Sequence, residues 1–179
     1  MITMPPRLLA DRARSIRLLG CDVDGVLTDG KLYLNDSGDE MKAFSTLDGH
    51  GIKMLQQTGV IVAIVTSRNS ETVARRAREL GIAHLVQGAA DKLAAWDVLV
   101  QALALTPEQC AYVGDDLPDL PVLRNCGLAV AVPNAAALVR AHAHYVTRAP
   151  GGAGAVRELC ELIMQAQGTL AQVQEAYLR

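Results

Sequence analysis

The sequence predicts an α/β fold built on a doubly wound, Rossmann-like parallel sheet. Short apolar runs alternate along the chain with stretches of helical pattern, which is typical of this fold class. The apolar runs consist almost continuously of Val, Ile and Leu, as expected for strands covered on both faces. The 179 residues are 50% hydrophobic, enough for one sizeable core, so residues 1–179 are expected to form a single domain.

Twelve elements follow from this pattern. Strands are expected where Val, Ile and Leu cluster in short runs, at residues 16–23, 60–66, 85–87, 110–114, 128–132 and 145–147. Helices are expected between them, at residues 51–58, 70–80, 92–104, 117–125, 135–141 and 156–167. Pro118 suits the first turn of the fourth helix, where its missing N–H is not needed.

Residues 31–45 interrupt the alternation. Two short strand-like pieces flank Asn35-Asp36-Ser37-Gly38, a sequence typical of a β-hairpin turn. The segment follows the first strand directly, so it should project over the carboxyl end of the sheet. It is either a decorative hairpin or a flap over a ligand, and we favour the flap.

Composition excludes several classes of function. The net charge is only −2, from 17 basic and 19 acidic residues, and aromatic residues make up 3% of the chain, so no nucleic-acid surface is expected. No apolar run is long enough to cross a membrane, and residues 1–17 lack the apolar core of a signal peptide. Cys21 and Cys110 read as buried thiols in strands, and the four cysteines lack metal-site spacing, which favours a reducing cytoplasm.

Two carboxylates follow the first strand. Asp22 and Asp24 are two positions apart, and in an extended chain alternate side chains lie on the same face, so both leave the sheet on the same side. Gly25 permits a tight turn that brings the backbone close to a ligand. Ligands bind α/β sheets at the carboxyl ends of strands. An Asp-rich turn would explain this motif alone equally well.

Three further polar groups stand at strand ends, and together they favour a functional site. They are Thr66-Ser67-Arg68, then Lys92 at a helix start, then Asp115-Asp116 with Asp119. Each has an ordinary explanation, since Thr66 and Asp115 could cap helices and Lys92 could be a solvated charge. Four such groups at successive strand ends are hard to explain as independent accidents.

These residue types suit phosphoryl transfer. Asp22 could attack phosphorus to form an aspartyl-phosphate, and Asp24 could protonate the leaving oxygen and then activate water. The attack of an anion on an anionic phosphate requires cations. Lys92 supplies one, and Asp22, Asp115 and a backbone carbonyl form an oxygen-only set that suits Mg²⁺. The Thr66 hydroxyl could hold phosphate oxygens without adding charge.

The ordered motifs D-V-D-G at 22–25, Thr66, Lys92 and G-D-D-x-x-D at 114–119 resemble the haloacid dehalogenase superfamily of aspartyl-phosphate phosphatases. The resemblance implies that Asp22, the Asp24 carbonyl and Asp115 hold Mg²⁺. Asp116 and Asp119 would support these ligands, and Asp119 would either contact the ligands alone or bind the ion through a water. Substrate contacts would come from Thr66, Ser67, Arg68 and Lys92, where Arg68 is either a partner for a substrate carboxylate or an ordinary surface side chain.

The motif spacing leaves no room for a cap domain. The 42 positions from Asp24 to Thr66 are used by the hairpin, one helix and one strand, and the 26 from Thr66 to Lys92 by one helix and one strand. An uncapped site needs cover from elsewhere, so a homo-oligomer is expected. The tail at residues 168–179 would either fray or, as the resemblance suggests, reach a neighbouring subunit's site.

Three longer motifs narrow the resemblance to one family. They are D-G-V-L-T-D-G at 24–30, D-G-H-G-I at 48–52 and G-G-A-G-A-V-R-E at 151–158, and they resemble the 3-deoxy-D-manno-octulosonate 8-phosphate phosphatases. That family implies a sugar-phosphate substrate, a homotetramer and a role in lipopolysaccharide inner-core sugar synthesis. Ser67 and Ala153 depart from its usual pattern, and the second departure puts in doubt any substrate contact carried over from that loop.

Two alternatives stay open. One is a phosphatase for another keto-acid sugar phosphate, such as a sialic-acid-type 9-phosphate. The other is a non-catalytic regulatory domain on the same scaffold, which retention of all four motifs argues against. His50, expected near a helix start, would either face the sugar or be a solvated or capping side chain.

Overall fold

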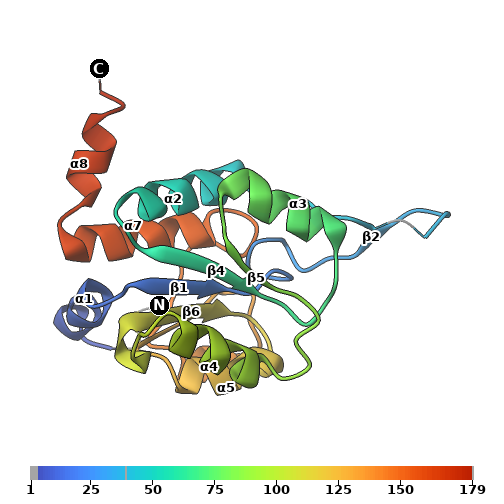
Figure 1. Ribbon diagram of the computed structural model, residues 1–179, viewed down its shortest axis with the longest axis horizontal. Coiled ribbons are helices and arrows are strands. Elements are labelled where there is room, and N and C mark those ends of the chain that lie inside the picture. Colours follow the sequence, from blue (N-terminus) through green and yellow to red (C-terminus); the bar gives the residue numbers. More distant parts are fainter. Residues whose placement is uncertain (1–3, 39, 179) are drawn as a thin grey trace.

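A six-stranded parallel sheet forms the centre of the computed structural model, which describes residues 4–38 and 40–178. Its strands lie in the order β5-β4-β1-β6-β7-β8 (Figure 1). They are β1 (Leu18–Cys21), β4 (Ile61–Val65), β5 (His84–Val86), β6 (Cys110–Gly114), β7 (Leu128–Ala131) and β8 (Tyr145–Val146). The first strand of the chain lies inside the sheet and later strands add on both sides, which confirms the predicted doubly wound fold.

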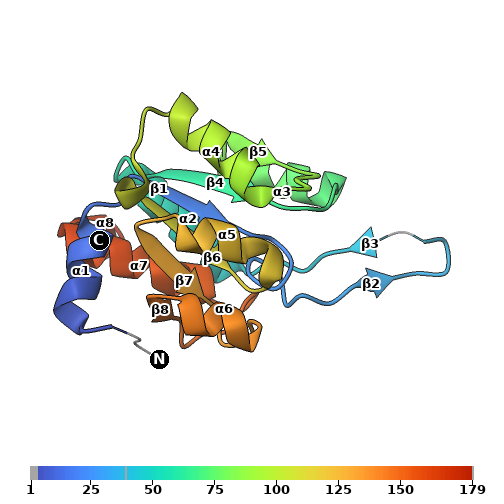
Figure 2. The ribbon, with the colours of Figure 1, turned by 90° about the horizontal axis from the view of Figure 1, so that it is seen from below.

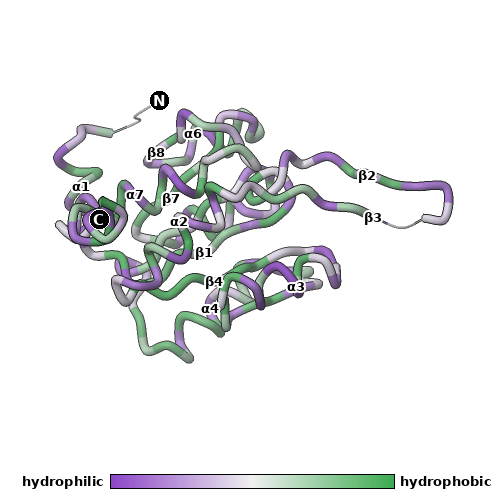
Figure 3. Tube along the Cα trace, turned by 90° about the horizontal axis from the view of Figure 1, so that it is seen from above, coloured by the Kyte–Doolittle hydropathy of each residue, from purple (hydrophilic) through white to green (hydrophobic). Residues whose placement is uncertain are grey.

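The core lies on both faces of the central strands. Leu18 of β1 pairs with Ile61 on one side and with Cys110 on the other. Every residue of β1 and β6 is buried, and β1 and β4 are among the apolar parts of the trace in Figure 3. Burial on both faces explains why these strands read as unbroken apolar runs.

Helices cover both faces of the sheet. In Figure 1, α2 (Thr46–Gln57), α3 (Glu71–Leu80) and α7 (Ala155–Gln167) lie above it, and α4 (Lys92–Ala102) and α5 (Leu120–Arg124) lie below. The short α6 (Ala137–His142) contacts α5 and β7, and α1 (Pro6–Arg14) packs against α7. Two 3-10 turns, η1 (Pro107–Gln109) and η2 (Leu117–Asp119), and the C-terminal α8 (Leu170–Glu175) complete the described elements.

The structure extends one predicted helix and adds two more. The helix expected from residue 51 begins at Thr46, because the Ser45 side chain accepts a hydrogen bond from the Asp48 N–H and caps it. The sequence pattern did not indicate this first turn, because Gly49 and Gly51 are poor helix formers. The added helices are α1, which has no side-chain cap at its N-terminus, and α8, which lies in the tail.

The predicted hairpin is present, although its paired region is short. β2 (Tyr33–Leu34) and β3 (Glu40–Met41) pair antiparallel, and the hairpin projects from the body of the molecule (Figure 2). Asp39, within the predicted 31–45 segment, and Arg179, within the 168–179 tail, lie outside the described residues, as do residues 1–3. The role of the hairpin as a flap stays a prediction.

The described residues between the motifs hold no additional domain. The hairpin, α2 and β4 occupy the interval from Asp24 to Thr66, and α3 and β5 occupy the interval from Thr66 to Lys92. All four cysteines are free and buried, as expected for Cys21 and Cys110. Among the described helices, none combines the length and the apolar character needed to cross a bilayer.

Candidate active site

Adjacent strand ends bring the predicted residues together. The order β4-β1-β6 places Thr66, Asp22 and Asp115 directly after three neighbouring parallel strands. The Asp22 N–H still donates to the Val113 carbonyl at 3.1 Å, and the Thr66 N–H donates to the Val86 carbonyl at 2.9 Å. The sheet ladder therefore fixes the backbone of both residues up to the point where their side chains leave it.

A tight turn follows Asp22. The Val23 carbonyl accepts from the N–H groups of Leu27 and Thr28 at 2.9 and 3.0 Å. Gly25 has a φ of +91°, and a Cβ there would lie 2.1 Å from Asp115 Oδ2. A side chain at this position would be both strained and in collision, so the glycine allows the turn to lie against the Asp115 carboxylate.

Asn134, after β7, ties this turn to the loop before α7. Its side-chain amide donates to the Gly25 carbonyl at 3.0 Å, and its Oδ1 accepts from the Gly151 N–H at 2.9 Å. The Gly152 N–H donates to the Val26 carbonyl at 2.9 Å. Asn134 was not identified from the sequence, because its partners lie 109 and 17 residues away along the chain.

Lys92 lies between two buried carboxylates. Its Nζ is 2.8 Å from Asp22 Oδ1 and 2.7 Å from Asp119 Oδ1. It opens α4, where the Asp91 side chain caps the helix by accepting from the Ala94 N–H. The lysine is buried, so the alternative of an ordinary solvated charge is excluded.

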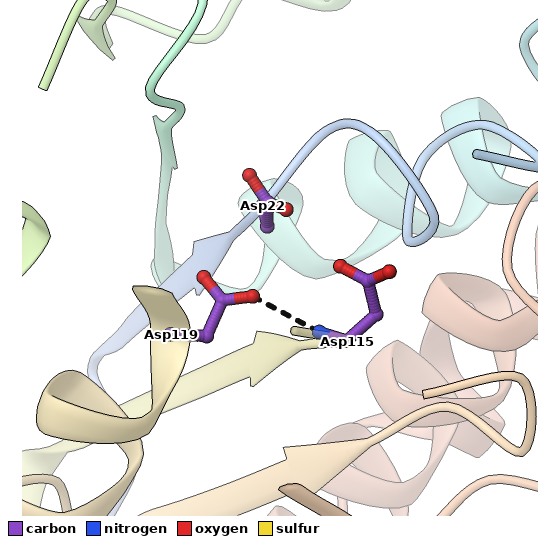
Figure 4. A group of neighbouring side chains, drawn as sticks. All are labelled: Asp22, Asp115 and Asp119. Atoms are coloured by element: carbon purple, nitrogen blue, oxygen red, sulfur yellow. Dashed lines mark hydrogen bonds between the residues drawn. The ribbon is translucent and has the colours of Figure 1, made fainter. Parts of the chain in front are cut away.

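Asp119 is fully buried and has partners at both oxygens. Oδ1 accepts from Lys92 and from the Tyr112 hydroxyl at 3.1 Å, and Oδ2 accepts from the N–H groups of Asp115 and Asp116 at 3.0 and 3.2 Å. Figure 4 shows its carboxylate beside those of Asp22 and Asp115. Tyr112 was not predicted as part of the site, since it reads as a core residue of β6.

The crowding of these carboxylates changes their acidity. Burial raises the pKa of Asp22 to about 8, with a further rise from Asp119 that Lys92 opposes. Burial also raises the pKa of Asp115 to about 6, and Asp119 adds to that rise. Burial would lower the pKa of Lys92, but the carboxylates of Asp22 and Asp119 raise it above its ordinary value. The cluster thus carries an excess of negative charge that a cation would relieve.

The cluster fits a divalent cation. One side-chain oxygen from each of Asp22, Asp115 and Asp119 lies within 4.8 Å of the other two. The Asp119 oxygens are already engaged by Lys92, Tyr112 and two backbone N–H groups, which leaves Asp22 and Asp115 as the freer donors. An all-oxygen donor set with high negative charge is the chemistry that Mg²⁺ prefers.

All nine residues selected from the sequence line one pocket of about 260 Å³. They are Asp22, Asp24, Thr66, Ser67, Arg68, Lys92, Asp115, Asp116 and Asp119. Thr66 is buried, and its Oγ1 accepts from the Arg68 N–H at 3.4 Å, whereas Ser67 and Arg68 are exposed at the rim. Perturbed carboxylates and a buried lysine in one concave site are typical of catalytic centres.

Two charged residues of the hairpin also reach the site. Lys42 forms a short ion pair with Asp24 Oδ1, and Arg68 Nη2 lies 2.9 Å from Glu40 Oε1. The sequence predicted a hairpin beside the site but did not indicate which of its side chains face inward. The alternation of Glu40 and Lys42 in a strand was the available signal.

His50 is not among the described residues that line the pocket, so the structure does not support the first of its two predicted roles. Because α2 begins at Thr46, His50 lies within the helix and not at its start. Its Nε2 lies 2.9 Å from the Tyr177 hydroxyl and its Nδ1 lies 3.1 Å from Arg157 Nη1. The earlier start of the helix turns this side chain toward the C-terminal segment.

Several known proteins are similar to this chain in sequence. Residues 39–127 match the model of the haloacid dehalogenase-like hydrolases. The 3-deoxy-D-manno-octulosonate 8-phosphate phosphatase KdsC of Yersinia pestis is 52% identical over 159 residues, which cover 89% of this chain and 85% of that protein. KdsC of Escherichia coli strain K12 is 50% identical over the same shares.

The chain belongs to the KdsC family of haloacid dehalogenase-like hydrolases. A solved KdsC-family structure, the 3-deoxy-D-manno-octulosonate 8-phosphate phosphatase of Moraxella catarrhalis, superimposes with a TM-score of 0.95 at 44% identity, covering 97% of this chain and 99% of that one. That crystal holds a magnesium ion, a phosphate ion and a KDO molecule. The family resemblance expected from the motifs is therefore confirmed.

Proposed function

We propose that this protein is a Mg²⁺-dependent phosphomonoesterase that hydrolyses 3-deoxy-D-manno-octulosonate 8-phosphate to KDO and phosphate. The observation that carries the proposal is the pair Asp22 and Asp24 beside the buried Lys92 in one pocket. Membership of the KdsC family supplies the substrate class. Its place would then be the synthesis of the lipopolysaccharide inner-core sugar.

In the first half-reaction, a carboxylate oxygen of Asp22 attacks phosphorus and the bond to the ester oxygen breaks. Asp24, two residues further along the turn, gives its proton to the leaving sugar oxygen. Lys92 holds Asp22 in place through the 2.8 Å contact and offsets negative charge near the phosphate. The Thr66 hydroxyl and the exposed Ser67 supply neutral donors to the phosphate oxygens.

In the second half-reaction, water attacks the phosphorus of the aspartyl-phosphate. Asp24, now ionised, takes a proton from that water, and the Asp22 carboxylate is regenerated as phosphate leaves. Splitting the reaction in this way gives both Asp22 and Asp24 a role in each half-reaction. It explains why the site places two carboxylates on one turn and only one of them against Lys92.

Asp22, Asp115 and the Asp24 carbonyl would hold Mg²⁺, with Asp116 and Asp119 supporting them from behind. The bound ion supplies positive charge that lets the anionic nucleophile approach an anionic phosphate. Asp119 acts mainly by holding Lys92 and the Asp115 backbone, as its hydrogen bonds indicate.

We also propose that the whole chain works as one domain of a homotetramer in the reducing cytoplasm. The hairpin exposes Leu32, Leu34 and Met41, apolar side chains that a neighbouring subunit would cover. A flap and a neighbouring tail would close the uncapped pocket, since Arg68 and Ser67 lie open at its rim. Arg68 would then meet the carboxylate of the sugar acid.

Phosphate release from a panel of esters tests the proposal. We expect the eight-carbon 3-deoxy sugar acid 8-phosphate to give the highest kcat/KM, a sialic-acid-type 9-phosphate less, and removal of Mg²⁺ by a chelator to abolish both. Preference for the nine-carbon ester would reassign the substrate. Inactivity toward every ester in the presence of Mg²⁺ would favour a regulatory domain.

A further inference from the structure

A cluster of four charged side chains joins the hairpin to the catalytic turn. Glu40 lies in β3 and Lys42 follows it by two residues, so both side chains leave the same face of the extended strand. Met41 between them points outward and is exposed. Asp24 and Arg68 complete the cluster from two strand ends.

Lys42 is the central cation of this cluster. Its Nζ forms a short ion pair with Asp24 Oδ1 and lies 3.2 Å from Glu40 Oε1, and its side chain is only 2% exposed. Lys31, on the other arm of the same hairpin, is 74% exposed and lies 3.6 Å from Asp29. An exposed pair of that kind contributes little, whereas a cation enclosed by two carboxylates holds a fixed geometry.

The two oxygens of Asp24 are treated differently. Lys42 engages Oδ1, while Arg68 Nη1 approaches Oδ2 only to 3.9 Å, beyond hydrogen-bond range. Asp24 lines the pocket, and Lys42 is not among the described residues that do. Lys42 thus holds the Asp24 carboxylate through Oδ1, from a position that is not part of the described pocket lining.

We propose that Lys42 is a positioning residue that orients the Asp24 carboxylate for proton transfer to the leaving group. This inference rests on the proposed function, because it assigns a support to the acid–base residue of that reaction. The hairpin then contributes to catalysis within its own subunit, in addition to any cover it gives the pocket. Glu40 assists by holding Lys42 and Arg68 together.

The inference predicts a dependence on the leaving group. A sugar alkoxide needs a proton as it departs, whereas p-nitrophenolate leaves readily without one. General acid catalysis contributes about 10²- to 10⁴-fold to such reactions. Lys42→Met should therefore lower kcat for the sugar phosphate at least about 10-fold more than kcat for p-nitrophenyl phosphate.

Matched variants separate positioning from folding. Lys31→Met, in the same hairpin, should leave both rates unchanged, and Lys42→Arg should restore part of the selectivity for the sugar phosphate. Lys42→Met added to Asp24→Asn should cause no further selective loss, since its target carboxylate is already gone. If Lys42→Met fails to fold, Glu40→Gln, which weakens the same cluster, should shift the ratio in the same direction.

An equal loss toward both esters, or no loss, would overturn the inference while leaving the proposed function intact. A selective loss that persists in the Asp24→Asn background would also overturn it, because Lys42 would then act on something other than Asp24. Inactivity of the unmodified protein toward both esters would instead overturn the proposed function, and the inference with it.

Discussion

At the scale of single residues, the site is organised by uncompensated negative charge. Asp22, Asp115 and Asp119 lie close together, and burial, with a further contribution from Asp119, raises the pKa values of Asp22 and Asp115. Lys92 holds the Asp22 carboxylate in place, but its single positive charge is shared with Asp119 and does not neutralise both carboxylates. Two predictions follow from this arrangement.

Asp22→Asn should lower turnover by at least about 10³-fold, because the amide cannot form the covalent intermediate. Asn keeps the shape of Asp, so the fold should be retained and Mg²⁺ should still bind through Asp115, more weakly. Steady-state rates and calorimetric Mg²⁺ titration measure the two effects. Retention of more than a small fraction of turnover would show that Asp22 is not the nucleophile.

Mg²⁺ binding should release a proton near neutral pH. The folded pKa of Asp22 is raised to about 8, so below that pH the metal-free protein carries a proton that Mg²⁺ must displace. Because the folded pKa lies above the unfolded one, the folded state holds this proton more tightly. The contribution of Asp22 to the free energy of unfolding of the metal-free protein is therefore greatest at acidic pH and is lost as the pH rises through about 8. Mg²⁺ affinity should therefore increase with pH over this range.

Calorimetry in buffers of different ionisation enthalpy measures the released proton. We expect about one proton per Mg²⁺ near pH 6.5 and almost none near pH 9. Asp22→Asn should remove most of the release at the lower pH, leaving only the smaller share that comes from Asp115. An Mg²⁺ affinity that is constant across this range would contradict the raised pKa.

At the scale of elements, the neighbours of β1 pack tightly against the strand that leads to Asp22. Trp96 of α4 and Tyr112 of β6 meet edge to face, with ring centroids 5.4 Å apart, directly over Gly20 of β1. The Tyr112 hydroxyl then reaches Asp119. One aromatic pair thus links a helix, two strands and the buried Asp119 carboxylate of the pocket.

Gly20→Ala should destabilise the fold by about 1–3 kcal/mol, the usual cost of overpacking a core. The added Cβ would lie 2.4 Å from the Trp96 ring and 2.7 Å from the Tyr112 ring. All three residues are buried. A lower urea midpoint with an unchanged slope measures the loss.

Trp96→Leu removes the obstructing ring, so it should partly offset Gly20→Ala in a double-mutant cycle. Strictly additive effects, or a midpoint that Gly20→Ala does not lower, would show that β1 tolerates the extra atom.

At the scale of the whole molecule, the pocket is open and two segments project from the body. One is the hairpin, and the other is the C-terminal segment with α8, which stands away from the sheet in Figure 1. Within the single chain, the Tyr177 hydroxyl near the end of that segment contacts His50 of α2. Both segments are suited to contacts beyond their own sheet.

Deleting residues 169–179 should change kcat and KM without changing the fold or the proposed oligomeric state. The deleted segment would otherwise gate a neighbouring pocket, so its loss should alter substrate entry and product release. Circular dichroism, sedimentation and steady-state kinetics at matched concentration measure the three properties. Tyr177→Phe serves as a control that removes only the hydroxyl contact with His50. A fully active monomer would contradict shared cover of the pocket.

The sequence by itself determined which polar residues stand at the ends of the buried strands. Val, Ile and Leu runs ending in Asp22, Thr66 and Asp115 predicted the parallel sheet and the residues at its edge, because burial on both faces leaves a continuous apolar pattern. The start of α2 was missed, since Gly49 and Gly51 weaken the helical pattern while the Ser45 cap supports it.

Only the tertiary structure decided which distant side chains act on one another. Lys42 reaches Asp24 across 18 residues, and Asn134 reaches Gly25 across 109. These contacts depend on how the hairpin and the loops fold back over the sheet, and no local periodicity encodes that. Local pattern therefore identifies the candidate catalytic groups, whereas long-range packing decides which side chains hold those groups in place.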